Sequence, residues 1–103
     1  MKDYLKIKQF LGLAKRSGNL ITGESLVLDA VRKNKAKIVF IAKDASANTQ
    51  KKFTDKTKYY NIPSTTILTS EDIAEALGVP RKIVAITDVG FAKKFQILLK
   101  EKG

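Results

Sequence analysis

The four residues Thr22-Gly23-Glu24-Ser25 have types and an order that suit contact with a phosphate-bearing ligand. They lie where a short apolar run ends and a helical pattern begins, and the first amides of a helix have no partner within it. Such amides can donate to phosphate oxygens or base edges, and Gly23, which has no Cβ, would let a ligand backbone come close. From spacing alone a purely structural role is favoured, with Thr22 capping the helix and Gly23 easing the turn.

Two further segments combine a predicted backbone turn with basic side chains. They are Lys43-Asp44-Ala45-Ser46 and Gly78-Val79-Pro80-Arg81-Lys82, and each borders a predicted strand. A turn that exposes cations suits contact with a sugar-phosphate backbone. Solvated loop charge without any ligand explains the same pattern, so this alternative stays open.

The residue types that the chain lacks exclude several kinds of site. It has no cysteine and no histidine, which excludes disulfides, thiolate nucleophiles, the usual zinc sites and Ser-His triads. The acidic residues show no cluster with the spacing of an oxygen-ligated Mg²⁺ or Ca²⁺ site. We predict that the protein is not an enzyme and uses no metal or other cofactor.

The longest apolar runs indicate a protein that does not cross a membrane. Phe10–Ala14 and Ile38–Ala42 span five residues each, against about 18 needed for a membrane helix. The first residues lead into mixed polar sequence rather than into the apolar core of a signal peptide. We expect a cytoplasmic protein with no membrane partner.

The net charge of +10 is unevenly distributed along the 103 residues. Residues 1–58 carry 14 basic and 5 acidic side chains, whereas residues 59–103 carry 6 and 5. This distribution favours a polyanion partner, because Lys and Arg gain by neutralising phosphates and releasing counterions. Chance clustering of surface lysines is the alternative. A membrane surface fits less well, since no basic helix has bulky aromatic residues on its opposite face.

Alternating helix and strand patterns must position these segments. The spacing of apolar residues predicts five helices, over Asp3–Arg16, after Thr22, over Ala47–Tyr60, after Thr69 and after Asp88. In the second helix the expected buried residues are Leu26, Val27, Ala30 and Val31.

Four extended segments alternate with these helices, at Asn19–Thr22, Lys37–Ala42, Ser64–Leu68 and Lys82–Thr87. The second and fourth are apolar runs typical of strands that are covered on both faces. The predicted fold is a single α/β domain over residues 1–103. It is a three-layer α-β-α sandwich with a small four-stranded mixed sheet.

The order of motifs along the chain resembles that of a known protein family. The segments that carry the resemblance are FLGLA at 10–14, SGNLITGE at 17–24, KAKIVFIAKDAS at 35–46, LGVPR at 77–81 and DVGFAKK at 88–94. Each motif alone is weak, whereas their combined order and spacing are fairly specific and cover almost the whole chain. The sequence resembles the bacterial YlxQ-like branch of the kink-turn RNA-binding ribosomal-protein family, the L-seven-Ae group.

The resemblance implies an α-β-α sandwich that binds folded RNA without a cofactor or catalysis. It implies RNA contacts at the turn around Gly23, in the first turn of the following helix, and in the loop Gly78–Lys82. Three positions depart from the family's pattern. Ser25 and Leu26 stand where polar or basic RNA-reading side chains are usual, and Asp29 stands where a lysine is usual.

We therefore predict non-catalytic binding of structured RNA that is kink-turn-like, ribosomal or otherwise related to translation. Ribosomal RNA, in the ribosome or another ribonucleoprotein, is the expected partner. The residues expected to approach RNA closely are Thr22, Gly23, Glu24, Ser25, Val79 and Pro80. The expected phosphate contacts are Lys15, Arg16, Lys33, Lys43, Arg81 and Lys82. The alternative is a protein–protein interaction module of the same fold that does not bind RNA directly.

Overall fold

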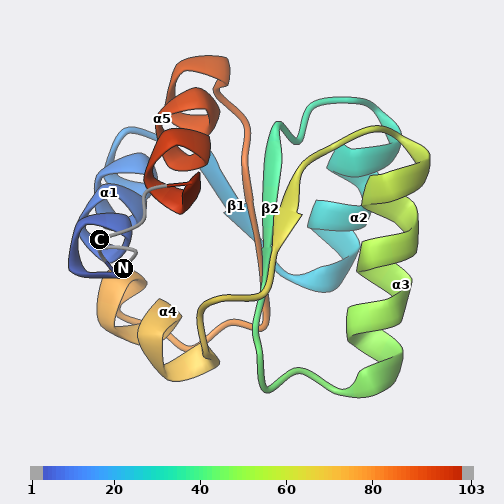
Figure 1. The fold of residues 1–103 in the computed structure, drawn as a ribbon, viewed down its shortest axis with the longest axis horizontal. Coiled ribbons are helices and arrows are strands. Elements are labelled where there is room, and N and C mark those ends of the chain that lie inside the picture. The colour runs from blue at the N-terminus through green and yellow to red at the C-terminus, as the bar shows by residue number, and fades with distance from the viewer. Residues whose placement is uncertain (1–3, 101–103) are drawn as a thin grey trace.

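Five helices and four strands alternate along residues 4–100, which are the residues that this computed structural model describes (Figure 1). They are α1 (Tyr4–Arg16), β1 (Leu20–Thr22), α2 (Glu24–Arg32), β2 (Ile38–Ile41), α3 (Ala47–Tyr59), β3 (Ser64–Thr65), α4 (Ser70–Leu77), β4 (Ile83–Ile86) and α5 (Val89–Lys100). This arrangement confirms the predicted order of elements.

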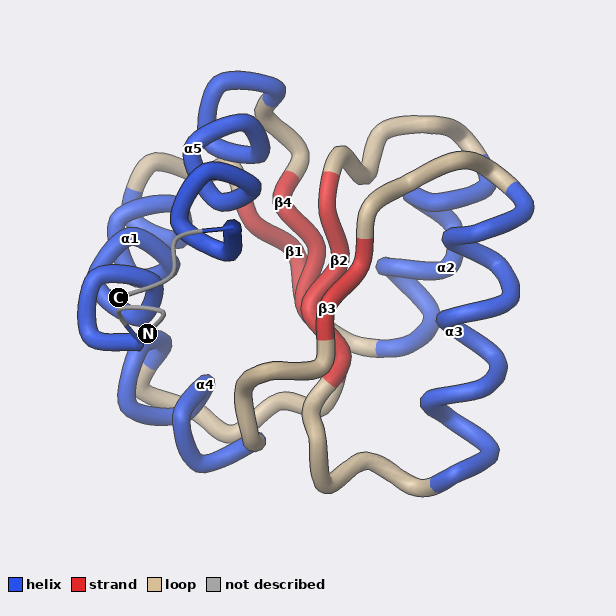
Figure 2. Tube along the Cα trace, viewed as in Figure 1, coloured by secondary structure: helices blue, strands red, loops and turns tan. Residues whose placement is uncertain are grey.

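The four strands form one mixed sheet in the order β1-β4-β2-β3. Strand β4 runs antiparallel to both β1 and β2, and β2 runs parallel to β3. Helices α1, α4 and α5 cover one face of the sheet, and α2 and α3 cover the other (Figure 2). The predicted three-layer sandwich is therefore confirmed.

Each face of the sheet packs against its own apolar cluster. Phe40 and Val84 belong to the cluster under α1, α4 and α5, where the Phe40 ring meets Phe95 edge-on at a centroid distance of 5.0 Å. Val39 and Ile83 belong to the cluster under α2 and α3. Side chains alternate between the faces because successive residues of a strand point to opposite sides. Both central strands are buried along their whole length, as their apolar composition predicted.

Three helix boundaries follow the predicted capping chemistry. The Thr69 hydroxyl accepts from the Asp72 amide, while the Asp72 carboxylate accepts from the Thr69 amide, which makes a complete capping box. Helix α4 then ends at Gly78, whose φ of 85° is left-handed. The Asp88 carboxylate accepts from the Phe91 amide at 2.9 Å at the start of α5.

None of the helices in the described part of the chain has the length and apolarity needed to cross a membrane.

The start of α2 differs from the prediction at two residues. Gly23, not Thr22, is the N-cap residue, and no side chain caps the helix. Thr22 instead ends β1, where it pairs with Val84 of β4 and is held out of the capping position. Leu26, which was expected in the core, is 64% exposed. The arc that α2 buries runs through Val27, Ala30 and Val31, so the packing of α2 against the sheet and α3 leaves Leu26 outside it.

Candidate functional site

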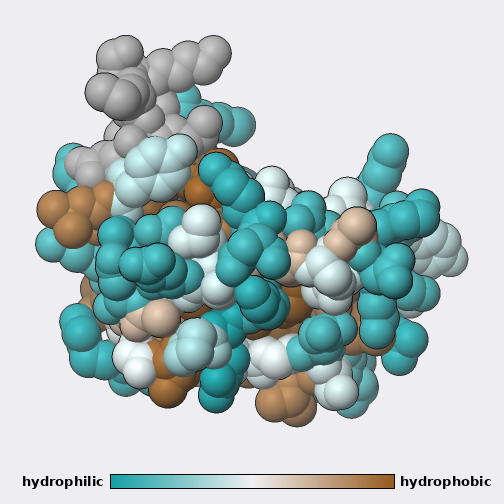
Figure 3. All heavy atoms as spheres, turned by 90° about the horizontal axis from the view of Figure 1, so that it is seen from below, coloured by the Kyte–Doolittle hydropathy of each residue, from teal (hydrophilic) through white to brown (hydrophobic). Residues whose placement is uncertain are grey.

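The turn at Gly23 and the loop 78–82 meet in a surface cleft at one end of the sheet. The β1–β4 pairing brings them together, since the Gly23 amide donates to the Ile83 carbonyl at 3.1 Å. The cleft has a volume of about 480 Å³ and is lined by Gly23, Glu24, Ser70, Pro80, Arg81, Lys82 and Ile83. The view from below shows hydrophilic residues interspersed with apolar areas on this side of the molecule (Figure 3).

The backbone of Gly23 has a conformation that only glycine adopts readily. Its φ of 97° and ψ of 147° lie far from the regions open to residues with a Cβ. A Cβ built at this position would have no atom within 4 Å among the described residues. Gly23 is therefore required by the backbone geometry, and the space above it is open to a ligand.

The first turn of α2 presents backbone donors beside this glycine. The first hydrogen bond within the helix runs from the Val27 amide to the Gly23 carbonyl at 3.0 Å. The amides of Glu24, Ser25 and Leu26 precede it and have no acceptor within α2. All three residues are exposed, so the turn that carries these amides lies at the surface.

The Arg81 guanidinium crosses the turn from the opposite wall of the cleft. Its Nε donates to the Thr22 hydroxyl at 3.3 Å, and its Nη1 donates to the Pro80 carbonyl at 2.9 Å. A guanidinium has five N–H donors, so these two bonds orient the group while leaving others to face a ligand. Thr22 thus contributes by holding Arg81 rather than by capping α2.

Lys82 is held by an ion-pair network that the sequence did not indicate. Its Nζ lies 2.9 Å from the Asp44 carboxylate, which also accepts from the Ser70 hydroxyl at 2.5 Å and the Ser70 amide at 2.8 Å. The bonds from Ser70 and then that from Lys82 hold the pKa of Asp44 well below its usual range. The network ties the loop after β2 to the start of α4 and to the loop before β4.

Two other predicted cations lie beside the cleft. The Ala42 amide donates to the Lys82 carbonyl at 2.7 Å, which places the next residue, Lys43, near that lysine. The Nζ of Lys15 donates at 2.6 Å to the carbonyl of Leu77, directly before the loop 78–82. Val79 and Pro80 are exposed on that loop. Pro80 lines the cleft itself, and Lys15 and Lys43 lie next to segments that border it.

The remaining two predicted cations lie outside the cleft lining. Arg16 lines two grooves along α1, one of them shared with α5 and the other with α4. Lys33 is the C-cap residue of α2 and pairs with Asp29 at 3.1 Å. A helix rises 1.5 Å per residue, so Lys33 lies about 15 Å along α2 from the Gly23 turn.

Ser70 is a cleft residue that the sequence interpretation missed. The sequence pattern assigns Ser70 to a helix-capping segment, and its position directly after the Thr69 cap is the one sequence signal for a surface hydroxyl there. Residues 4–100 contain no group of three or more His, Cys, Asp or Glu side chains that could hold a metal ion.

Comparisons of the sequence identify relatives over most of the chain. The model of the Ribosomal protein L7Ae/L30e/S12e/Gadd45 family matches residues 5–96. An RNA-binding protein YlxQ from Enterococcus faecium is 47% identical over 95 residues, which cover 92% of each chain. An RNA-binding protein YlxQ from Bacillus subtilis (strain 168) is 42% identical over 90 residues, covering 86% of this chain and 90% of the relative.

Solved structures share the same architecture. A Bacillus halodurans protein of unknown function superposes with a TM-score of 0.89 and 31% identity, covering 98% of this chain and 100% of the other. The Giardia lamblia 15.5 kD RNA-binding protein superposes with a TM-score of 0.76, covering 91% of this chain and 88% of the other. At 18% identity, this second similarity shows the shared fold alone.

Proposed function

Since the chain belongs to the Ribosomal protein L7Ae/L30e/S12e/Gadd45 family, as its motifs predicted, we propose that it binds structured RNA through the cleft between Gly23 and Arg81. The prediction that it is not an enzyme is confirmed, because the matched family is one of ribosomal proteins and the curated relatives are named RNA-binding proteins.

The observation that carries the proposal is the meeting of donors and an acceptor in one cleft. The first amides of α2 and the Arg81 guanidinium are donors suited to phosphate and ribose oxygens. The Glu24 carboxylate, which lines the same cleft, only accepts, so its partners on RNA are base N–H groups or 2′-hydroxyls. Such a combination suits a folded RNA with exposed base edges better than a uniform duplex.

The exposed apolar residues around the cleft fit this interaction. Leu26 is 64% exposed in the first turn of α2, and Val79 is 36% exposed on the loop 78–82. Neither can hydrogen-bond through its side chain, so each contributes by packing against a sugar or an unstacked base. Asp29 is paired with Lys33, which reduces its repulsion of phosphate. We therefore expect the protein to recognise RNA through backbone amides, the Glu24 carboxylate and apolar packing. These contacts replace those of the polar or basic side chains that are usual at positions 25, 26 and 29.

The proposed target is RNA related to translation in the cytoplasm, either ribosomal RNA or an RNA with a kink-turn-like bend. In this arrangement Lys15 and Lys43 contact phosphates beside the cleft, together with Arg81 and Lys82. The segregated positive charge of residues 1–58 supports such contacts. Arg16 and Lys33 contact only an RNA that extends beyond the cleft.

Fluorescence anisotropy can test the proposal with four labelled RNAs. They are a kink-turn RNA, a duplex of the same length without the bulge, a ribosomal RNA fragment and a tRNA. We expect submillimolar binding to at least one folded RNA and weaker binding to the duplex. Millimolar affinity for all four RNAs in low salt would refute RNA binding.

Arg81→Ala and Lys58→Ala form a matched pair for locating the site, because Lys58 is an exposed cation on α3, away from the cleft. Loss of a phosphate contact lowers the slope of log affinity against log salt by about one unit. We expect this change for Arg81→Ala alone. Equal effects of the two substitutions would show that the cleft is not the site.

A further inference from the structure

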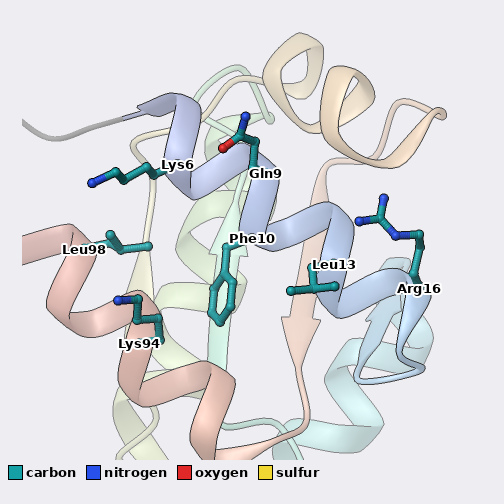
Figure 4. A pocket seen from close by; sticks show the side chains of 7 residues that line it. All are labelled: Lys6, Gln9, Phe10, Leu13, Arg16, Lys94 and Leu98. Carbon is teal, nitrogen blue, oxygen red and sulfur yellow. The ribbon is translucent and has the colours of Figure 1, made fainter.

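A second groove lies between α1 and α5, on the side of the sheet opposite α2 and α3. Phe10 and Leu13 project from α1 toward α5, and Lys94 and Leu98 face them from α5 (Figure 4). The volume of the groove is about 340 Å³, within the range of ligand-binding clefts. It shares no lining residue with the cleft at Gly23, so both surfaces can be occupied together.

Exposed apolar side chains are concentrated on the two helices that form this groove. Of the eight large hydrophobic residues that are exposed in the described chain, five lie on α1 or α5. They are Tyr4, Leu5, Leu13, Val89 and Ile97. Leu13 is the one of these five that lines the groove, where it forms the apolar surface together with Phe10 and Leu98. The other four lie outside the lining, so the apolar contact that a partner makes in the groove rests on Phe10, Leu13 and Leu98.

The floor of the groove is packed against the core. The Phe10 ring lies 4.6 Å from the Phe91 ring and 4.9 Å from the Phe95 ring, measured between centroids. Phe10 is thus engaged in the protein's own aromatic cluster, and the floor offers carbon surface instead of a free ring for base stacking. This surface suits aliphatic or aromatic side chains better than nucleotide bases.

The charged residues that line the groove within residues 4–100 are all basic. Lys6, Arg16 and Lys94 line it, and none of its seven lining residues in the described chain is acidic. An apolar floor between cations is complementary to an apolar stripe between carboxylates. Two helices form the walls, and a groove of this kind accommodates a third amphipathic helix.

We propose that the groove between α1 and α5 binds an amphipathic helix of a partner protein, with apolar residues on the floor and Asp or Glu toward Arg16 and Lys94. The partner helix lies away from the Gly23 cleft, so the protein can hold a partner together with an RNA that is confined to the cleft and does not reach Arg16. The groove's own side chains carry this inference, and it does not depend on the proposed RNA site.

The first test uses synthetic peptides and isotope-labelled protein. The probe is a helical peptide of about 18 residues with leucines at i, i+3, i+4 and i+7 and glutamates on both flanks. A scrambled peptide of the same composition and a peptide with lysines in place of glutamates are the controls. We expect NMR shift changes on α1 and α5 with the acidic amphipathic peptide only. Absence of binding at millimolar peptide, or equal binding of the scrambled peptide, would overturn the proposal.

Two pairs of variants then locate the peptide. Lys94→Glu should weaken peptide binding about ten-fold, whereas Lys93→Glu, the same charge change outside the groove lining, should change it less than about two-fold. Leu13→Gln should weaken binding about ten-fold, while Leu5→Gln, an exposed change on the same helix, should not. Equal effects within either pair would refute the groove as the site.

A short single-stranded RNA provides the last control. If it shifts the same α1 and α5 amides and competes with the peptide, the groove binds nucleic acid and the proposal fails. The two proposals can fail separately. A protein that binds RNA but not the peptide contradicts only the groove proposal, and a protein that binds the peptide but not RNA contradicts only the proposed function.

Discussion

Replacing Gly23 by alanine separates its two possible contributions, backbone conformation and close approach of RNA. Its φ of 97° and ψ of 147° penalise any residue with a Cβ, by about 1–3 kcal/mol. No described atom lies within 4 Å of the added Cβ, so the cost is backbone strain without a steric clash. Alanine is better than valine for this test, because a β-branched side chain adds further strain at positive φ.

The expected loss of stability is measurable in urea. Small domains have m-values of about 1–3 kcal/mol/M, so a loss of about 2 kcal/mol lowers the unfolding midpoint by about 1 M. Total stability is typically about 5–15 kcal/mol, which leaves Gly23→Ala mostly folded in buffer. RNA affinity measured on this folded protein should fall about ten-fold or more, because the Cβ occupies the space where RNA approaches.

Gly18→Ala is the matched control for Gly23→Ala. Gly18 also has a positive φ, 76°, with no described atom within 4 Å of an added Cβ, and it lies in the turn between α1 and β1. It should lose stability and keep its RNA affinity within about two-fold. Unchanged RNA affinity in Gly23→Ala would refute close approach at this residue. An equal loss of affinity in both variants would trace the effect to destabilisation.

Three further predictions test the network, the core and the orientation of Arg81. Asp44 has a lowered pKa in the folded protein, so its stabilising effect is complete above its unfolded pKa of about 3.9. That effect is lost as the pH falls through the folded value. Asp44→Asn should therefore flatten the acid limb of the urea midpoint against pH, and an unchanged limb would contradict the network. Phe53→Ala, at a fully buried position, should lower the free energy of unfolding by about 3–5 kcal/mol. Leu26→Ala should change it by no more than about 0.5 kcal/mol in urea titrations. Equal losses would contradict the burial assigned to the two side chains. Thr22→Val should lower RNA affinity less than Arg81→Ala does. Because Thr22 acts by holding Arg81, the two losses should not add in the double variant. Full additivity would show that Thr22 does not act through Arg81.

The elements that sequence predicted well are those governed by local interactions. The capping box at Thr69 and Asp72 involves residues three apart, and the turn at Gly78 needs only a residue that tolerates positive φ. The apolar run of β2 is buried on both faces because no polar residue interrupts it. The expected extended segment Ser64–Leu68 is longer than the observed strand, because β3 pairs with β2 only at Ser64 and Thr65.

The pairings within the candidate site depend on contacts between distant residues. Thr22 and Arg81 are 59 positions apart, and Asp44 and Lys82 are 38 apart. No periodicity or local motif encodes such pairs, because each depends on the strand order of the sheet. For this reason Lys82 was predicted as a phosphate contact without its Asp44 partner, and Thr22 was predicted as a cap.

The sequence by itself determined the alternation of helices and strands, the family, the absence of thiol and imidazole chemistry, and the excess of positive charge before residue 59. These properties follow from composition and from patterns within a few residues. Only the tertiary structure decided that β4 lies between β1 and β2, which brings Gly23 and Arg81 into one cleft and leaves Lys33 outside it. The physical reason is that strand pairing joins residues far apart in the chain, and which side chains then share a surface depends on that pairing.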